Sequence, residues 1–149
     1  MRAVVQRIKK GSVSIDQKIT GSIEYGLLVY LGVEDGDTEK DVHYMVEKIC
    51  NLRIFEDEQG KMNRSVIDVQ AGILGISQFT LLGDCRKGRR PNFTRAGEPI
   101  AANHLYEGFL EGCKGYDLQV ASGVFQEHMM VSSINDGPVT ILIDSKKNF

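Results

Sequence analysis

Three polar side chains interrupt an apolar segment that is otherwise typical of a central β-strand. Residues 72–82 are Gly-Ile-Leu-Gly-Ile-Ser-Gln-Phe-Thr-Leu-Leu, which would place Ser77, Gln78 and Thr80 in a buried strand. Each buried polar group without a partner costs about 1–3 kcal/mol. A binding site or an interface would supply partners, and so would hydrogen bonds across the strand ladder. The residues by themselves leave both hypotheses open.

A basic cluster follows this segment. Five of the eighteen lysines and arginines fall within ten positions: Arg86, Lys87, Arg89, Arg90 and Arg95. Glycines and Pro91 predict a loop, and arginine forks match phosphate oxygens. Solvated surface charge is the usual explanation for such a run. The net charge of −2 gives no overall attraction to nucleic acid, so any such affinity must come from this cluster.

The stretch Asn135-Asp136-Gly137-Pro138-Val139-Thr140 lies between two strand-like segments, 129–134 and 139–143. An Asp-Gly corner between two such segments predicts a β-hairpin. Pro138 lacks a backbone donor, and the Gly137-Pro138 bond is of the kind that tolerates the cis form. A cis bond would point two carbonyl oxygens in the same direction, which suits an ammonium group. An ordinary trans turn is the alternative that these residues favour.

Arg7, Phe125 and Met129 are further candidates with two interpretations each. Arg7 lies in an apolar strand, where general burial preferences favour an exposed side chain. Phe125 and Met129 would pack in a core, or would line a flat slot for a nucleobase, because aromatic and thioether side chains favour stacked π surfaces.

Several classes of site are disfavoured. Cys50, Cys85 and Cys113 are odd in number and widely spaced, which argues against a disulfide framework and a zinc site and predicts free thiols. No Ser-His-Asp set, metal-ligand spacing or cofactor motif is evident, so we expect no metal and no cofactor. No apolar run is long enough for a membrane span, and no signal peptide is evident, which predicts a cytoplasmic protein without a membrane partner.

The elements that must position these residues follow from hydrophobic periodicity. The pattern predicts strands at 3–8, 12–15, 19–23, 27–33 and 116–124, in addition to 72–82. Helices are predicted at 38–51, after a capping box, and from Glu98-Pro99 to Gly112. The length of 149 residues predicts one domain, 1–149, with one core.

Taken together, Ser77-Gln78-Phe79-Thr80-Leu81, the basic run 86–91 and the stretch 135–140 resemble the D-aminoacyl-tRNA deacylase family, also called D-tyrosyl-tRNA deacylases. The resemblance covers essentially the whole chain. Residues 82–85 (Leu-Gly-Asp-Cys) depart from the family pattern, which affects only local packing.

This resemblance implies an α/β (α+β) fold, a mostly antiparallel, β-barrel-like sheet with two flanking helices. It implies a homodimer that has its active site at the subunit interface and acts on tRNA carrying a D-amino acid or glycine. Gly137 and Pro138 would form a cis pair that enters the partner's pocket and excludes L-amino acids. Arg7 would orient their carbonyls, and Phe125 and Met129 would bind the terminal adenosine.

The resemblance also implies roles in ester hydrolysis. We expect Gln78 to orient the ester or ribose beside Ser77, and the backbone N–H groups of Phe79 and Thr80 to bind the oxyanion. Thr80 would position rather than attack, because no base to activate it is evident. The tRNA would contact Arg86, Lys87, Arg89 and Arg90. A covalent acyl-enzyme at Thr80 or Cys85, and a non-catalytic RNA-binding module, remain as alternatives.

Overall fold

β3 (Gly26–Gly32) is buried on both faces, and the rest of the fold is arranged around it. In the computed structural model, which describes residues 1–149, Leu27, Val29 and Leu31 belong to a large hydrophobic cluster beneath two helices. Leu28 belongs to a second, smaller cluster on the opposite face of the sheet. Because side chains alternate along a strand, a strand covered on both faces is apolar throughout, as predicted for 27–33.

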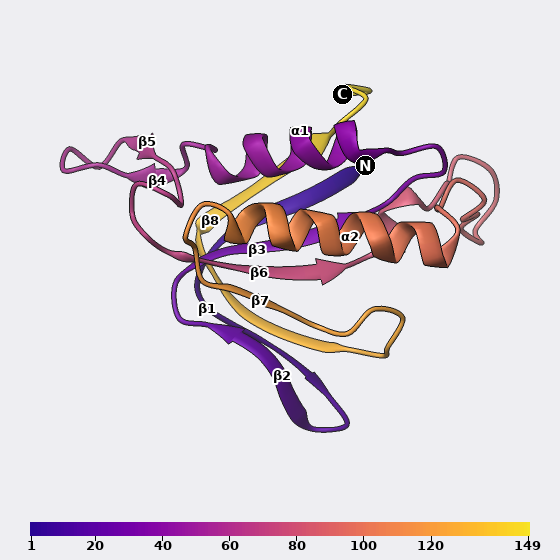
Figure 1. Cartoon of the computed structure of the whole chain (residues 1–149), viewed down its shortest axis with the longest axis horizontal. Coiled ribbons are helices and arrows are strands. Elements are labelled where there is room, and N and C mark those ends of the chain that lie inside the picture. The colour runs from indigo at the N-terminus through magenta and orange to yellow at the C-terminus, as the bar shows by residue number, and fades with distance from the viewer.

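The sheet has six strands in the order β2-β1-β3-β6-β7, with β8 also paired to β1. Besides β3 these are β1 (Arg2–Ile15), β2 (Lys18–Ile23), β6 (Gly72–Ser77), β7 (Val120–Ser122) and β8 (Met130–Asp144). β1 is antiparallel to β2, β3 and β8, whereas β3, β6 and β7 are parallel. The sheet curls until Gly21 of β2 lies against the backbone of Ser122 in β7 (Figure 1). The predicted barrel-like, mostly antiparallel sheet is therefore confirmed.

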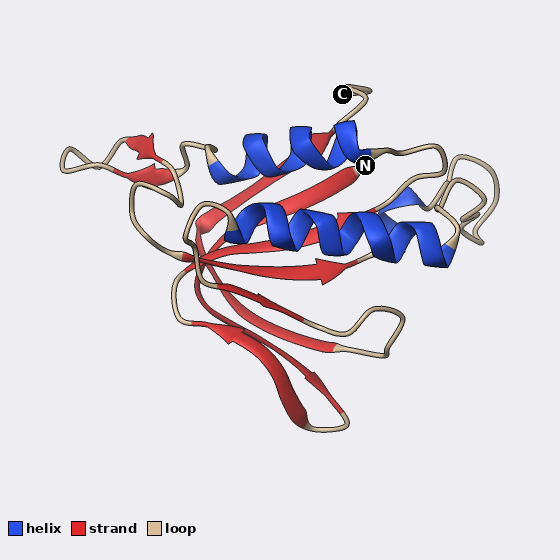
Figure 2. Cartoon of the chain, viewed as in Figure 1, coloured by secondary structure: helices blue, strands red, loops and turns tan.

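Two helices cover one face of this sheet, as Figure 2 shows in blue. α1 (Glu39–Cys50) begins with the predicted capping box between Thr38 and Asp41. α2 (Pro99–Lys114) begins after Glu98, whose carboxylate accepts hydrogen bonds from the first turn. Both helix predictions are confirmed to within two residues.

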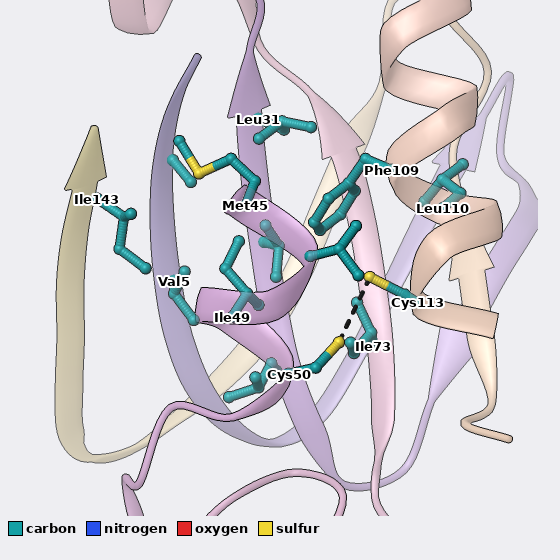
Figure 3. Close-up of a cluster of buried hydrophobic side chains, with 14 of the residues drawn as sticks. Val5, Leu31, Met45, Ile49, Cys50, Ile73, Phe109, Leu110, Cys113 and Ile143 are labelled. Carbon is teal, nitrogen blue, oxygen red and sulfur yellow. Dashed lines mark hydrogen bonds between the residues drawn. The ribbon is translucent and has the colours of Figure 1, made fainter. Parts of the chain in front are cut away.

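The helices contact each other through buried side chains (Figure 3). Cys50 of α1 and Cys113 of α2 lie 3.8 Å apart between their sulfur atoms, and all three cysteines are free, as predicted. The hydrogen bond between the two thiols and burial raise the pKa of Cys113. This thiol therefore stays protonated and contributes to packing.

The predicted hairpin at 129–143 is wrong. These residues form the single strand β8, and both of its halves pair with β1. A 14-residue strand offers partners to both segments, so the Asp-Gly corner becomes a bulge rather than a reversal. The Gly137-Pro138 bond within this bulge is cis, as the resemblance implies.

Two strand predictions were too long. Strand 72–82 ends at Ser77, and Phe79–Leu82 form the 3₁₀ helix η1, so Gln78 and Thr80 leave the sheet. Strand 116–124 shortens to Val120–Ser122 because only these residues find partners on β6. Two other predicted strands were too short, because 3–8 and 12–15 form one continuous strand, β1.

The polar segment after α1 forms an exposed hairpin of β4 (Phe55–Glu56) and β5 (Met62–Arg64). The buried ring of Phe55 packs in the large cluster and anchors this hairpin. None of the helices is both long and apolar enough to cross a membrane.

Candidate active site

A cleft of about 600 Å³ opens where β3 and β6 end. Its walls come from these two strands, from η1, from the start of α2 and from the loop between β7 and β8. Eleven of its eighteen lining residues are hydrophobic. A largely apolar cleft with a few polar groups is typical of a small-molecule or cofactor site, and this volume lies within the usual range.

The cleft brings together five of the predicted site residues: Ser77, Gln78, Phe79, Phe125 and Met129. Ser77 is the last residue of β6, and Gln78 is held by a 2.8 Å hydrogen bond from its backbone N–H to the carbonyl of Leu31. Phe125 and Met129, the residues predicted to bind a nucleobase, come from the loop between β7 and β8 and line the same cleft as Ser77, Gln78 and Phe79.

Thr80 does not line the cleft. Its side chain is exposed on η1, and its hydroxyl accepts a 2.5 Å hydrogen bond from Nε2 of Gln78. The Gln78 amide is thus held by a neighbour two residues away. Since Nε2 is engaged, the other end of the amide, Oε1, remains free to accept a hydrogen bond. No residue that could act as a base hydrogen-bonds to the Thr80 hydroxyl.

Sequence reasoning missed three further residues of the cleft: Tyr106, Glu127 and His128. The Tyr106 hydroxyl donates to the carbonyl of Gly75 at 2.9 Å, and burial raises the pKa of Tyr106 to about 12. This phenol therefore stays protonated near neutral pH. His128 forms no hydrogen bond or ion pair with Ser77 or with a carboxylate, so no catalytic triad is assembled here.

Arg7, Gly137 and Pro138 lie elsewhere, in the bulge between β1 and β8. Gln6 pairs with Thr140 and Ile8 with Asn135, so one residue of β1 opposes four residues of β8, 136–139. Leu27 of β3 pairs with Arg7 of β1 on one side and with Ile73 of β6 on the other. Gln78 follows Ile73 by five residues, just beyond the end of β6. At ~3.3 Å per residue, Gln78 lies about 16 Å further along the strand direction than the bulge, and the two steps between neighbouring strands add to this separation. In Figure 1 the arrow of β6 points away from the bend of β8.

Arg7 is only 5% exposed, so the exposure expected from burial preferences is wrong. The strand carries its guanidinium beneath the bulge, where Nη1 donates to the carbonyl of Ile54 at 2.7 Å. Nε lies 3.2 Å from the carboxylate of Asp136. The buried charge is thus compensated by a carboxylate of the bulge itself.

Asn135 holds the two sides of the bulge together, and the sequence alone did not single it out for this. Its side-chain amide donates to the carbonyls of Arg7 at 2.9 Å and Val139 at 3.0 Å. These bonds satisfy carbonyls that the interrupted ladder leaves without partners. Gly137 and Pro138 are both exposed. They lie in a bulge whose two ends Asn135 holds together.

Four of the five basic residues, Arg86, Lys87, Arg89 and Arg90, lie in a loop closed by two backbone hydrogen bonds between Asp84 and Asn92, whereas Arg95 lies beyond it and pairs with Glu34. Arg86 donates to Asp84 from Nε at 2.9 Å and from Nη2 at 2.6 Å. These bonds hold the pKa of Asp84 well below its usual range. Arg86 is therefore already paired, whereas Lys87, Arg89 and Arg90 are exposed and form no ion pair.

No group of three or more His, Cys, Asp or Glu side chains is arranged to hold a metal ion. The chemistry available at the cleft is that of backbone N–H groups, the Gln78 amide, hydroxyl groups, the His128 imidazole and the Glu127 carboxylate.

Comparison with known proteins gives consistent results. The model of the family described as D-Tyr-tRNA(Tyr) deacylase matches residues 4–144. A D-aminoacyl-tRNA deacylase of Alkaliphilus metalliredigens (strain QYMF) is 60% identical over 149 residues, and one of Thermosipho africanus (strain TCF52B) is 55% identical, with both chains covered completely in each case. The solved structure of a c-Myc DNA Unwinding Element Binding Protein superposes with a TM-score of 0.90 at 42% identity, covering 97% of this chain and 98% of that one.

Asn135→Ala is expected to destabilise the fold by about 2 kcal/mol, because two partly buried carbonyls lose their donor. Urea unfolding measures the change. Gln6→Ala is the matched control, since it removes a single exposed hydrogen bond, to Thr140, beside the same bulge and should cost less than about 0.5 kcal/mol. Equal stability of the two variants would contradict the bracing role of Asn135.

Proposed function

The chain belongs to the D-Tyr-tRNA(Tyr) deacylase family, and we propose that it frees tRNA from D-amino acids by holding the ester in the cleft at the end of β6. It is a D-aminoacyl-tRNA deacylase, a hydrolase of the ester bond between a D-amino acid and tRNA. The observation that supports the proposed site is that Ser77, Gln78, Phe79, Phe125 and Met129 all line one cleft. Its action belongs in the cytoplasm, where aminoacyl-tRNA is used.

The terminal adenosine occupies the side of the cleft formed by Phe125 and Met129, whose apolar side chains suit the face of a base. The ester then lies against Ser77, Gln78 and Phe79. Gln78, held by Thr80, offers Oε1 to a ribose hydroxyl. The backbone N–H groups of Phe79 and Thr80 have no partner within η1, and they donate to the developing oxyanion.

The reaction needs little acid–base chemistry. An aminoacyl ester is activated, and a neighbouring ribose hydroxyl lies within reach of its carbonyl. Positioning and oxyanion binding therefore supply most of the rate enhancement. This mechanism agrees with a Thr80 hydroxyl that has no base beside it and with a Tyr106 that remains protonated.

Discrimination against L-amino acids comes from Gly137 and Pro138 of a second copy. Gln78 of the same chain lies about 16 Å further along the strand direction than the bulge, so we infer that the motif that enters the cleft belongs to another subunit. The outer face of β8 bears the exposed apolar side chains Met130, Ile134 and Leu142, which suit a homodimer interface. The buried guanidinium of Arg7 contacts Asp136 and holds the Gly137-Pro138 motif in orientation.

In this arrangement the carbonyl groups of the motif bind the substrate ammonium group and leave no room for an L side chain. A D side chain points away from the motif. Glycine has no side chain to exclude, so glycyl-tRNA is also a substrate. Selection thus acts by steric exclusion and needs no pocket for a particular D side chain.

The tRNA backbone follows the basic loop. Lys87, Arg89 and Arg90 contact phosphates, while Arg86 remains bound to Asp84 and supports the loop. Arg86 was expected to bind tRNA directly, and its occupied guanidinium favours this indirect role. Three phosphate contacts would make binding salt-dependent.

The main test uses purified protein with D-Tyr-tRNA and L-Tyr-tRNA in the presence of EDTA. Hydrolysis of the D ester and not of the L ester is the expected result, measured as release of labelled tyrosine. Equal rates on the two esters, or an intact D ester, would contradict the proposed function. Loss of activity in EDTA would contradict the metal-free mechanism.

Gly137→Ala should lower kcat/KM for D-Tyr-tRNA about 100-fold while the homodimer persists, because misplacement by about 1 Å suffices for such a loss. Gly137 has a φ of +121°, and an added Cβ would lie 2.8 Å from a methyl carbon of Val139. Gly36→Ala is the control, since Gly36 also has a positive φ but has no atom within 4 Å of its added Cβ. Sedimentation measures the dimer, and unchanged turnover would exclude the role of Gly137.

Thr80→Ala is expected to lower kcat by no more than about 100-fold, because Thr80 orients Gln78 and does not attack the ester. Loss of a true nucleophile costs about 10⁴-fold or more. Mass spectrometry after a substrate quench provides the second measurement. An acyl group trapped on Thr80 or on Cys85 would replace the positioning mechanism by a covalent one.

A further inference from the structure

An aromatic pair lies at the mouth of the cleft. Phe79 and Phe93 both line it, and their rings meet edge to face with centroids 5.1 Å apart and an interplanar angle of 67°. Phe79 is 57% exposed, whereas Phe93 is half-buried. An edge-to-face pair leaves one face of the exposed ring open to a third planar group.

The loop holds Phe93 in place although it belongs to no helix or strand. Phe93 directly follows Asn92, whose backbone is joined to Asp84 by hydrogen bonds of 2.8 and 3.0 Å. Its ring packs over Gly83, where an added Cβ would lie 3.0 Å from Cε1. The aromatic pair is therefore preformed, and binding would not have to order it.

The pair stands between the cleft and the basic loop. The exposed Lys87, Arg89 and Arg90 precede Phe93 by three to six positions, at the tip of the loop that Asp84 and Asn92 close. This loop lies at the right of Figure 1, beyond the end of β6. A strand of nucleic acid whose last nucleoside fills the cleft must pass Phe79 and Phe93 before its phosphates reach the basic tip.

We propose that Phe79 and Phe93 form a stacking platform for the nucleobase that precedes the terminal adenosine. This inference rests on the proposed function and adds a second nucleotide subsite to it. Every base has a π face, so the platform adds affinity without selecting a sequence, and the backbone runs on to the three free cations. Phe93 is a positioning residue that holds Phe79 at the correct angle.

The test compares the D-tyrosyl ester of adenosine with the D-tyrosyl ester of the dinucleotide cytidylyl-adenosine. For the unmodified protein we expect kcat/KM to be about tenfold higher for the dinucleotide ester. Phe93→Leu should bring this ratio close to one, because an aliphatic side chain cannot hold the Phe79 ring edge to face. Phe93→Tyr should restore the ratio, since it keeps the ring.

Ile100→Ala is the control, since Ile100 is 81% exposed at the start of α2 and does not line the cleft. An unchanged ratio in Phe93→Leu would overturn the inference. So would normal hydrolysis of D-Tyr-tRNA with neither short ester cleaved, because cleft and platform together should hold both nucleosides. If Phe93→Leu instead weakened the homodimer and slowed both esters equally, Phe79 would be a subunit contact. Failure of the proposed function would show itself separately, as an intact D-Tyr-tRNA.

Discussion

The pairing of β1 with β8 is the constraint on which the other features depend. It extends over most of both strands and has two irregularities, of which the larger is the bulge where residues 136–139 oppose the single residue Arg7. The ladder continues on both sides, so the ends of the bulge cannot move independently. Asn135 closes the bulge from within, and the Arg7 guanidinium lies beneath it against Asp136. Gly137 and Pro138 are thereby exposed on rigid backbone, which the proposed steric exclusion of L-amino acids requires.

The same strands set the distance between the two halves of the proposed site. Arg7 and Ile73 are joined through β3, and Gln78 follows at the far end of β6. Strand length cannot be altered by rearranging side chains, so one chain cannot close its own cleft with its own bulge. This separation and the exposed apolar face of β8 support the proposed assembly from two copies. Catalysis and selection would then depend on the dimer.

Charge and protonation distinguish binding groups from structural ones. Arg86 belongs to the basic cluster in sequence, but Asp84 occupies its guanidinium, so the proposed phosphate contacts are assigned to Lys87, Arg89 and Arg90. Tyr106 belongs to the cleft, but burial keeps it protonated. Positioning by backbone and amide groups is what remains, and an activated ester is a substrate for which positioning suffices.

Sequence by itself determined the features that depend on near neighbours: the capped helices with their apolar faces, the doubly buried β3, and the three motifs that indicate the family. It could not decide features that depend on distant partners. Arg7 was expected at the surface but meets Ile54 and Asp136, and 135–140 was expected to turn but continues along β1. Thr80 was expected in a strand but lies in η1. His128 was not expected to line the same cleft as Ser77, Gln78 and Phe79. Periodicity reports only which face of an element is apolar. Contacts between residues up to 144 positions apart decide what each polar group meets.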